Sequence, residues 1–154
     1  MKNNIYLNDK NQTRIFAEKI AEIAEIGDLI TLNGNLGAGK TSFVQYFVNY
    51  LFGDLIEITS PTFNLFHIYD LDKLKICHFD LYRLKTKEEI YEIGLEYALD
   101  NSISLIEWPD IIMDILPSNR LDLYIDFGQD ENSRVINFKG SAKWTKLLLE
   151  MNKL

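Results

Sequence analysis

The sequence has a single cysteine, Cys77, so it cannot form an internal disulfide. That usage is typical of the reducing cytoplasm, where we expect the protein to work. The first residues lack the apolar core of a signal peptide, and no apolar run approaches the length that spans a bilayer. Low-complexity tracts and fixed-period repeats are absent as well. These absences argue against a secreted disulfide scaffold, a membrane protein and a repeat array.

Positive charge is also scarce. Lysine and arginine total 16 against 23 aspartates and glutamates, which gives a net charge of −7. A protein that grips nucleic acid directly usually presents a basic patch, so we expect any RNA to be held by another protein. Only four arginines are present, too few for the arginine-rich lid with which phosphotransferases clamp a second substrate.

The chain is long enough for one well-packed core. It has 154 residues, of which 47% are hydrophobic and 25% charged, as in ordinary globular proteins. Because no linker-like segment interrupts the pattern, we predict a single domain over residues 1–154.

The most informative segment is GNLGAGKT at residues 34–41, which fits the Walker A pattern G-x-x-x-x-G-K-[ST]. An apolar run at 29–32 precedes it as a buried strand, and a helical pattern follows it. This context aims backbone N–H groups and a helix N-terminus at a phosphate. Lys40 would reach the β- and γ-phosphates, and the Thr41 hydroxyl would bind Mg²⁺. A chance glycine-rich turn is the alternative, and the flanking strand and helix argue against it.

Helical patterns alternate with buried strands along the rest of the chain. We predict helices over 11–26, 40–52, 86–93, 109–116 and 141–149. We predict strands over 29–32, 56–59, 64–69, 75–82, 103–107, 120–127 and 134–138. Two of the strand pairs read as antiparallel hairpins. The fold class that follows is α/β, a P-loop NTPase-like three-layer sandwich with a mixed central sheet.

A P-loop needs a second acidic group at the end of a neighbouring strand to hold Mg²⁺. Glu107 ends the buried strand 103–107 and is the best candidate, the alternative being a surface glutamate. Trp108 follows it, and stacking on a base and packing in the core are equally favoured roles for this residue.

Strand alternation places His78, Asp80 and Tyr82 on one face of the strand 75–82. Asp80 could orient or deprotonate an attacking water, or lie near the metal. The alternative is a satisfied hydrogen-bond network under the sheet. Cys77 points to the opposite face from His78, so a buried structural thiol is favoured over a metal or catalytic pair. The segment 60–62 (SPT) is a candidate switch that senses the γ-phosphate, or else an ordinary Ser-Pro turn.

Five segments occur together in the order and approximate spacing of one known family: 34–41 (GNLGAGKT), 60–63 (SPTF), 78–83 (HFDLYR), 92–95 (EIGL) and 105–108 (LIEW). In this combination the chain resembles the TsaE (YjeE) family. The resemblance extends from the first helix to the second hairpin. It implies a small ATPase required to make N6-threonylcarbamoyladenosine in tRNA. Its partners would be TsaD, which transfers the threonylcarbamoyl group, and TsaB, so that tRNA is met only indirectly.

The resemblance also implies roles for particular residues, with ATP and Mg²⁺ as cofactors. The phosphates would be cradled by Gly37, Ala38, Gly39, Lys40, Thr41 and Ser42. Thr41 and Glu107 would hold Mg²⁺, and Trp108 would lie on the adenine. Catalysis near the γ-phosphate would involve Asp80, Thr62 and Lys40. Arg134 would approach the nucleotide, and the segment around Asn8 would touch the base. Many members have Asp where this chain has Asn35, a departure we read as tolerated.

Three classes of function are therefore compared. The leading hypothesis is a slow ATPase that is stimulated by TsaB and TsaD and serves a tRNA-modifying complex. A small-molecule P-loop kinase is the runner-up, because the fold serves both chemistries. A nucleotide-sensing module that does not hydrolyse ATP is the third.

Overall fold

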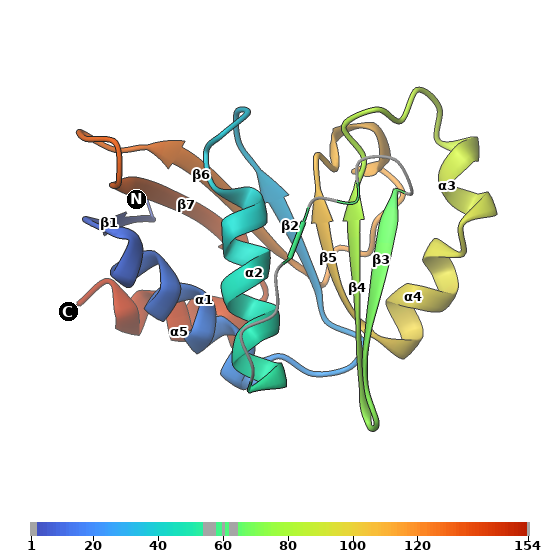
Figure 1. Ribbon diagram of the computed structural model, residues 1–154, viewed down its shortest axis with the longest axis horizontal. Helices are drawn as coiled ribbons and strands as arrows, with labels where there is room; N and C mark the ends of the chain where they lie inside the picture. Colours follow the sequence, from blue (N-terminus) through green and yellow to red (C-terminus); the bar gives the residue numbers. More distant parts are fainter. Residues whose placement is uncertain (1–2, 54–57, 60, 62–64, 154) are drawn as a thin grey trace.

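The computed structural model describes residues 3–53, 58–59, 61 and 65–153 of the chain. The strands of this described part form one sheet with the spatial order β1-β7-β6-β2-β5-β4-β3 (Figure 1). In chain order the strands are β1 (Asn4–Leu7), β2 (Leu29–Asn33), β3 (Phe66–Leu71), β4 (Leu74–Asp80), β5 (Ile103–Glu107), β6 (Leu121–Phe127) and β7 (Arg134–Gly140). The helices are α1 (Lys10–Ile23), α2 (Lys40–Phe52), α3 (Glu88–Glu92), α4 (Leu95–Asn101), the short 3-10 helix η1 (Asp110–Ile112) and α5 (Ala142–Met151).

The sheet is mixed, as predicted, because its centre and its edges pair differently. β2 runs parallel to both of its neighbours, β5 and β6, and β4 runs parallel to β5. The outer strands pair antiparallel: β3 with β4, β7 with β6, and β1 with β7. Parallel neighbours end at the same edge of a sheet. The carboxyl ends of β2, β5 and β4 therefore lie side by side, which is where ligands bind in open α/β sheets.

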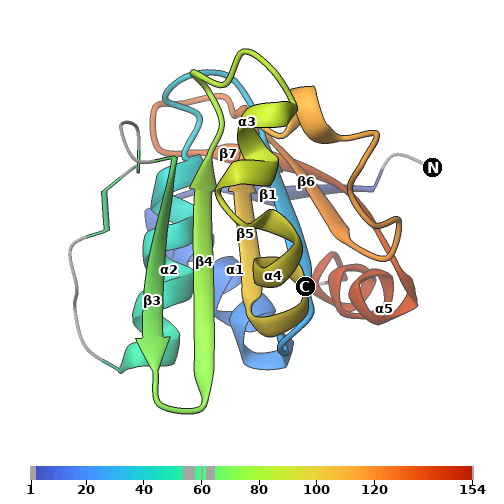
Figure 2. The same cartoon turned by 90° about the vertical axis from the view of Figure 1, so that its right-hand side faces the viewer.

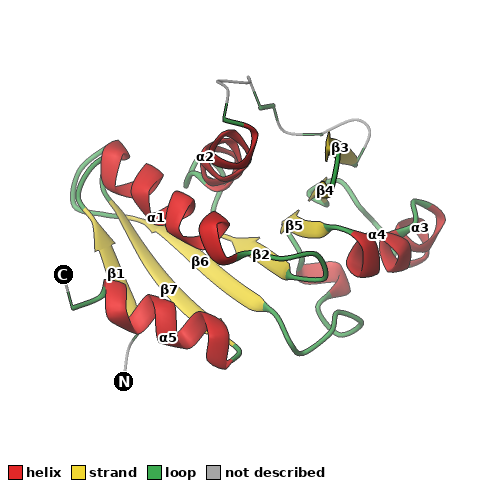
Figure 3. Cartoon of the chain, turned by 90° about the horizontal axis from the view of Figure 1, so that it is seen from below, coloured by secondary structure: helices red, strands yellow, loops and turns green. Residues whose placement is uncertain are grey.

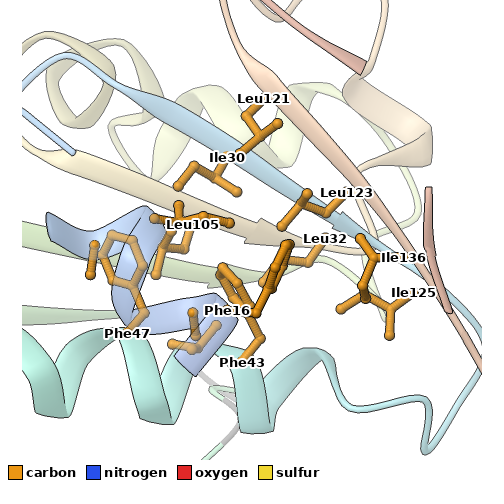
Figure 4. Close-up of a cluster of buried hydrophobic side chains, with 14 of the residues drawn as sticks. Phe16, Ile30, Leu32, Phe43, Phe47, Leu105, Leu121, Leu123, Ile125 and Ile136 are labelled. Atoms are coloured by element: carbon orange, nitrogen blue, oxygen red, sulfur yellow. The ribbon is translucent and has the colours of Figure 1, made fainter. Parts of the chain in front are cut away.

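One face of the sheet is packed against α1, α2 and α5. Figure 4 shows Phe16 of α1 with Phe43 and Phe47 of α2, facing aliphatic side chains of the sheet. The ring centroids of Phe16 and Phe43 are 6.1 Å apart. Trp144 and Leu148 of α5 belong to the same buried cluster. The aliphatic partners on the sheet include Ile30, Leu32, Leu105, Leu121, Leu123, Ile125 and Ile136.

The other face is covered by α3, α4 and η1 over the strands β2, β5 and β4. Cys77 and Phe79 of β4 and Ile106 of β5 pack there with Ile90 and Leu95 of the helices. Figure 2 shows α3 and α4 beside β4 and in front of β5, and Figure 3 shows α1 and α2 over the opposite side of the sheet. The predicted three-layer sandwich is confirmed.

The predicted helix over 109–116 is wrong. Only η1 forms there, and its hydrogen bonds join residues three apart, such as Ile112 N–H to the Pro109 carbonyl at 2.9 Å. Pro117 disfavours the helical region for the residue before it, which limits how far a helix can extend beyond η1.

Two elements were missed by sequence analysis. β1 has only four residues, and its pairing with β7 at the sheet edge stabilises it. The second is α4, which begins directly after Gly94. Gly94 has a φ of 81°, and α3 ends before it, as predicted. The predicted strand over 56–59 falls partly outside the described residues, and Ile58 and Thr59 lie in no regular element. Within the described ranges, no helix combines the length and apolar character needed to cross a bilayer.

Removing the side chain of Phe47 tests the packing of α1 and α2 against the sheet. Phe47 is fully buried between α2 and the sheet, and the cavity left by Phe47→Ala should lower the free energy of unfolding by about 3–5 kcal/mol. Tyr50, one turn later on α2, is 43% exposed and is the matched control. Tyr50→Ala should change the stability by less than about 0.5 kcal/mol. Urea denaturation measures both, and equal losses would contradict the assigned packing.

Candidate functional site

The glycine-rich loop joins β2 to α2 and is shaped by its glycines. A Cβ on Gly34 would stand 2.4 Å from the carbonyl oxygen of Ile125, so only glycine fits there. Gly39 has a φ of 110° and is the N-cap of α2. Because it has no side chain to accept hydrogen bonds from the first helical turn, the N–H groups of that turn are left for an anion.

Lys40 begins α2, and its side chain folds back over the loop. Its ammonium donates to the carbonyl oxygens of Gly34 at 2.6 Å and Asn35 at 2.9 Å. Burial lowers the pKa of Lys40, and the nearby carboxylates, Glu107 foremost, oppose this shift. The loop thus places its only lysine between its own carbonyl groups and a set of acidic side chains.

Glu107, at the end of β5, is almost completely buried and joins two other elements. The Thr41 hydroxyl of α2 lies 3.0 and 3.2 Å from its two carboxylate oxygens. Nε2 of His78 on β4 lies 2.5 Å from Oε2 of Glu107. An imidazole nitrogen so close to a carboxylate carries a hydrogen, so Nε2–H donates. The other ring nitrogen, Nδ1, is buried and has no hydrogen-bond partner among the described residues.

Strand register explains why these side chains meet. Glu107 lies opposite Leu32 of β2 and opposite Asp80 of β4. Asp80 is 6% exposed, and its carboxylate accepts a hydrogen bond from the backbone N–H of Tyr82 at 3.0 Å. His78 and Asp80 share a face, as predicted. Tyr82 lies exposed beyond the end of β4, but it lines the same cavity as Asp80.

Trp108 lies on the same side of the loop as Glu107. It has a φ of 54°, an uncommon left-handed conformation for a bulky residue. Its indole centroid is 4.0 Å from the Lys40 ammonium nitrogen, a cation–π contact, and its ring is 4.9 Å from that of Tyr82. The backbone conformation therefore directs the indole to the lysine.

These side chains line one open cavity of about 370 Å³. Of the residues singled out from the sequence, those that line the cavity are Gly37, Gly39, Lys40, Thr41, Ser42, Asp80, Tyr82, Glu107 and Trp108. Ala38 is buried and lines a different cavity. Thr62 lies outside the described residues, as does Ser60.

Arg134 lies on the opposite side of the loop, at the start of β7. Its Nε donates to the carbonyl oxygen of Ala38 at 2.7 Å, which ties the glycine-rich loop to the hairpin β6–β7. A second cavity, of about 140 Å³, opens there. Gly39 and Ser42 line both cavities, so the loop separates them. Other residues around the second cavity are Lys10 and Thr13 of α1 and Tyr46 of α2.

Two further residues lie away from both cavities. Asn8, before α1, donates its backbone N–H to Gln12 and lines a separate cavity near β1. Cys77 is buried in the core beneath α3 and α4, on the opposite face of β4 from His78. The predicted structural thiol is confirmed.

Comparison with known proteins decides the family. A family model described as "Threonylcarbamoyl adenosine biosynthesis protein TsaE" matches residues 7–136. The chain belongs to the TsaE family. The tRNA threonylcarbamoyladenosine biosynthesis protein TsaE of Rickettsia bellii is 41% identical over 131 residues, which cover 85% of this chain and 90% of the relative. The Bacillus subtilis protein of the same name is 35% identical over 140 residues, covering 90% and 86%.

A solved structure agrees with this assignment. The crystal structure of Bacillus subtilis YdiB superposes with a TM-score of 0.75 at 27% identity, over 97% of this chain and 93% of that one. The predicted P-loop NTPase-like fold is confirmed. As a member of the TsaE family, the protein functions in the biosynthesis of threonylcarbamoyladenosine in tRNA.

The contact between His78 and Glu107 was not predicted from the sequence. The alternation along β4 placed His78 on the correct face, but its partner lies 29 residues away on the adjacent strand. Nothing in a single sequence specifies that register. The Arg134–Ala38 contact was missed for the same reason.

We expect His78 to hold the buried Glu107 carboxylate. Leucine at this position would remove the donor and leave a buried carboxylate short of a partner, so His78→Leu should lower the free energy of unfolding by about 1–3 kcal/mol. His78→Gln keeps an N–H donor near the position of Nε2 and should lose less. Urea denaturation without nucleotide compares the two. Equal losses for leucine and glutamine would show that packing, and not this hydrogen bond, makes the contribution.

Proposed function

We propose that the protein is a Mg²⁺-dependent ATPase and an accessory subunit of the tRNA-modifying system, acting with TsaD and TsaB. The observation that carries the ATPase part is the contact between the Thr41 hydroxyl and the buried Glu107 carboxylate. It joins the end of a P-loop to the end of the neighbouring parallel strand, where P-loop proteins hold their metal ion. Membership of the TsaE family supports the role in tRNA modification.

The phosphates would be bound by residues 37–42. The unpaired N–H groups at the start of α2 and the positive end of its dipole favour a polyphosphate there. The Lys40 ammonium, now bonded to the Gly34 and Asn35 carbonyls, is positioned to donate to the β- and γ-phosphates. Asp80 and Glu107 then stand at the γ-phosphate end.

The donors at that end fit Mg²⁺. A hydroxyl has one hydrogen and two lone pairs, so Thr41 can donate to Glu107 and still offer oxygen to a cation. Glu107 keeps lone pairs for water in the metal's shell, and oxygen ligands are those that Mg²⁺ prefers. Thr41 and Glu107 would therefore hold the ion, which would neutralise charge that develops on the phosphates.

Asp80 is the group best placed to act on water. Its carboxylate lies at the end of β4 in the same cavity as Lys40 and Thr41. As the water oxygen bonds to the γ-phosphorus, the bond to the ADP oxygen breaks and a water proton passes to the carboxylate. We include Thr62 in this role from the family resemblance.

The direction of the nucleotide follows from the two cavities. With Lys40, Thr41 and Glu107 at the γ-phosphate end, the chain of phosphates leads past Gly39 and Ser42 toward the Arg134 cavity. We place the base there, beside Tyr46. The expected stacking of adenine on Trp108 fits poorly, because the indole lies against Lys40 and the base would have to fold back over its own phosphates.

Turnover should depend on the partners. The isolated chain should hydrolyse ATP slowly, and TsaB with TsaD should raise its turnover, as measured by phosphate release. Asp80→Ala should abolish the stimulated turnover, with a loss of about 10²-fold or more. Asp126→Ala is a matched control, since this exposed aspartate of β6 lies outside the cavity.

The same assay separates the other classes of function. Equal and fast turnover with and without partners contradicts the accessory role. Transfer of labelled phosphate to a small-molecule acceptor indicates a kinase. Full tRNA modification by Asp80→Ala indicates a nucleotide sensor that needs no hydrolysis.

Trp108 emission reports where the base binds. The chain has two tryptophans, and the other, Trp144, is buried in α5. Trp144→Phe therefore leaves Trp108 as the only source of tryptophan emission. We expect inorganic tripolyphosphate to change the emission as much as ATP does, because the indole contacts Lys40.

The base pocket is tested with a second variant. Tyr46→Ala should weaken binding of ATP by about tenfold and leave that of tripolyphosphate unchanged. Tyr50→Ala, on the exposed side of α2, is the control. A response of Trp108 to ATP alone, lost in Trp108→Ala together with ATP affinity, would restore the stacking role.

A further inference from the structure

Two carboxylates stand side by side at the nucleotide site. Asp80 ends β4 and Glu107 ends β5, and the two residues are register partners on parallel strands that Figure 2 shows next to each other. Paired residues of adjacent strands point to the same face of a sheet, and both side chains line the cavity beside the P-loop. They are only 6% and 2% exposed, so solvent screens little of the repulsion between their charges. The fold must therefore hold the two carboxylates in separate positions.

The two carboxylates are drawn in opposite directions along β4. That of Asp80 accepts a hydrogen bond from the backbone N–H of Tyr82, in the turn that follows the strand. That of Glu107 reaches back to His78, two residues before Asp80, where Nε2 of the imidazole lies 2.5 Å from Oε2. The hydrogen bond from His78 thus keeps Glu107 away from its neighbour in the register.

The same hydrogen bond fixes which oxygen of Glu107 faces the P-loop. Oε2 is held by the Nε2–H of His78, and Oε1 is the oxygen nearer to the Thr41 hydroxyl, at 3.0 Å. One carboxylate is therefore held from two sides, by β4 and by the start of α2. This leaves Oε1 beside the Thr41 oxygen, which is the other group proposed to hold the metal ion.

His78 is itself fixed by packing. Its side chain is fully buried, and the residues on either side of it in β4, Cys77 and Phe79, are anchored in the core beneath α3 and α4. A fixed donor behind a metal-binding carboxylate orients that ligand. Loss of such a donor typically lowers metal affinity by about 10- to 100-fold.

We propose that His78 is a positioning residue for the metal ion. Its Nε2–H holds Glu107 beside Thr41 and apart from Asp80, so that one carboxylate serves the ion and the other acts on water. His78 works through Glu107 and is not itself a ligand. The inference rests on the proposed function, because it concerns the Mg²⁺ site proposed there.

The test measures how much Mg²⁺ strengthens the binding of nucleotide. Calorimetry gives the affinity for a non-hydrolysable ATP analogue with excess Mg²⁺ and again with EDTA, and the ratio of the two affinities is the contribution of the ion. His78→Leu should lower this ratio by about tenfold or more and leave the affinity in EDTA within about twofold of wild type. A purely structural role would lower both affinities together and leave the ratio unchanged.

Two amide variants separate the hydrogen bond from the loss of the ring. The side-chain nitrogen of His78→Gln can stand near the position of Nε2, and this variant should keep the ratio within about threefold of wild type. That of His78→Asn stands near the position of Nδ1 and does not reach Glu107, so the ratio should fall as in His78→Leu. If His78→Leu does not fold, His78→Asn gives the same comparison.

The second histidine of the chain supplies a matched control. His67 lies opposite His78 in the register of β3 with β4, and it is only partly buried. His67→Gln makes the same replacement one strand further from Glu107. It should keep the wild-type ratio.

Each outcome decides the inference. A wild-type ratio in His78→Leu and His78→Asn overturns it, as does a higher ratio, which would mean that His78 competes with the ion for Glu107. Equal losses in His78→Gln and His78→Asn also overturn it, because the ring and not the N–H would then matter.

Glu107→Gln distinguishes the inference from the proposed function. If this variant keeps the wild-type ratio, the proposed metal site fails, and the inference fails with it. If Glu107→Gln lowers the ratio and neither His78→Leu nor His78→Asn does, the metal site stands and His78 has no positioning role.

Discussion

The buried carboxylate of Glu107 is the constraint on which the site depends. It accepts hydrogen bonds from Thr41 at the start of α2 and from His78 on β4, and so holds the P-loop helix and two parallel strands in one arrangement. A buried charge is tolerated only when such partners surround it. The three elements must therefore keep their register, and the cavity beside the loop takes its shape from that requirement.

The two faces of β4 contribute to different parts of the structure. His78 and Asp80 point toward the P-loop, while Cys77 and Phe79 belong to the core beneath α3 and α4. Because the strand is buried on both faces, a change on one of them displaces side chains on the other. The packing beneath α3 and α4 and the position of Asp80 therefore depend on the same strand.

Local patterns predicted much of the fold and the site, and the failures have physical causes. The P-loop, the strand that ends at Glu107 and the face shared by His78 and Asp80 follow from motif spacing and strand alternation. The helix over 109–116 was wrong because only the 3-10 helix η1 forms there, and Pro117 disfavours helical backbone at the residue before it. β1 was missed because a four-residue edge strand is stabilised by its neighbour more than by its own residues. The left-handed backbone of Trp108 could not be foreseen from the sequence, and the stacking of adenine on its indole stays a prediction.

The sequence by itself determined the family, the phosphate-binding loop and the identity of the acidic groups around it, since these depend on residue types at short, fixed spacings. Only the tertiary structure decided which groups touch. The His78–Glu107 pair, the Arg134–Ala38 contact and the contact of Trp108 with Lys40 all join segments far apart in the chain. Such contacts depend on strand order and register, which long-range packing sets and local spacing does not record.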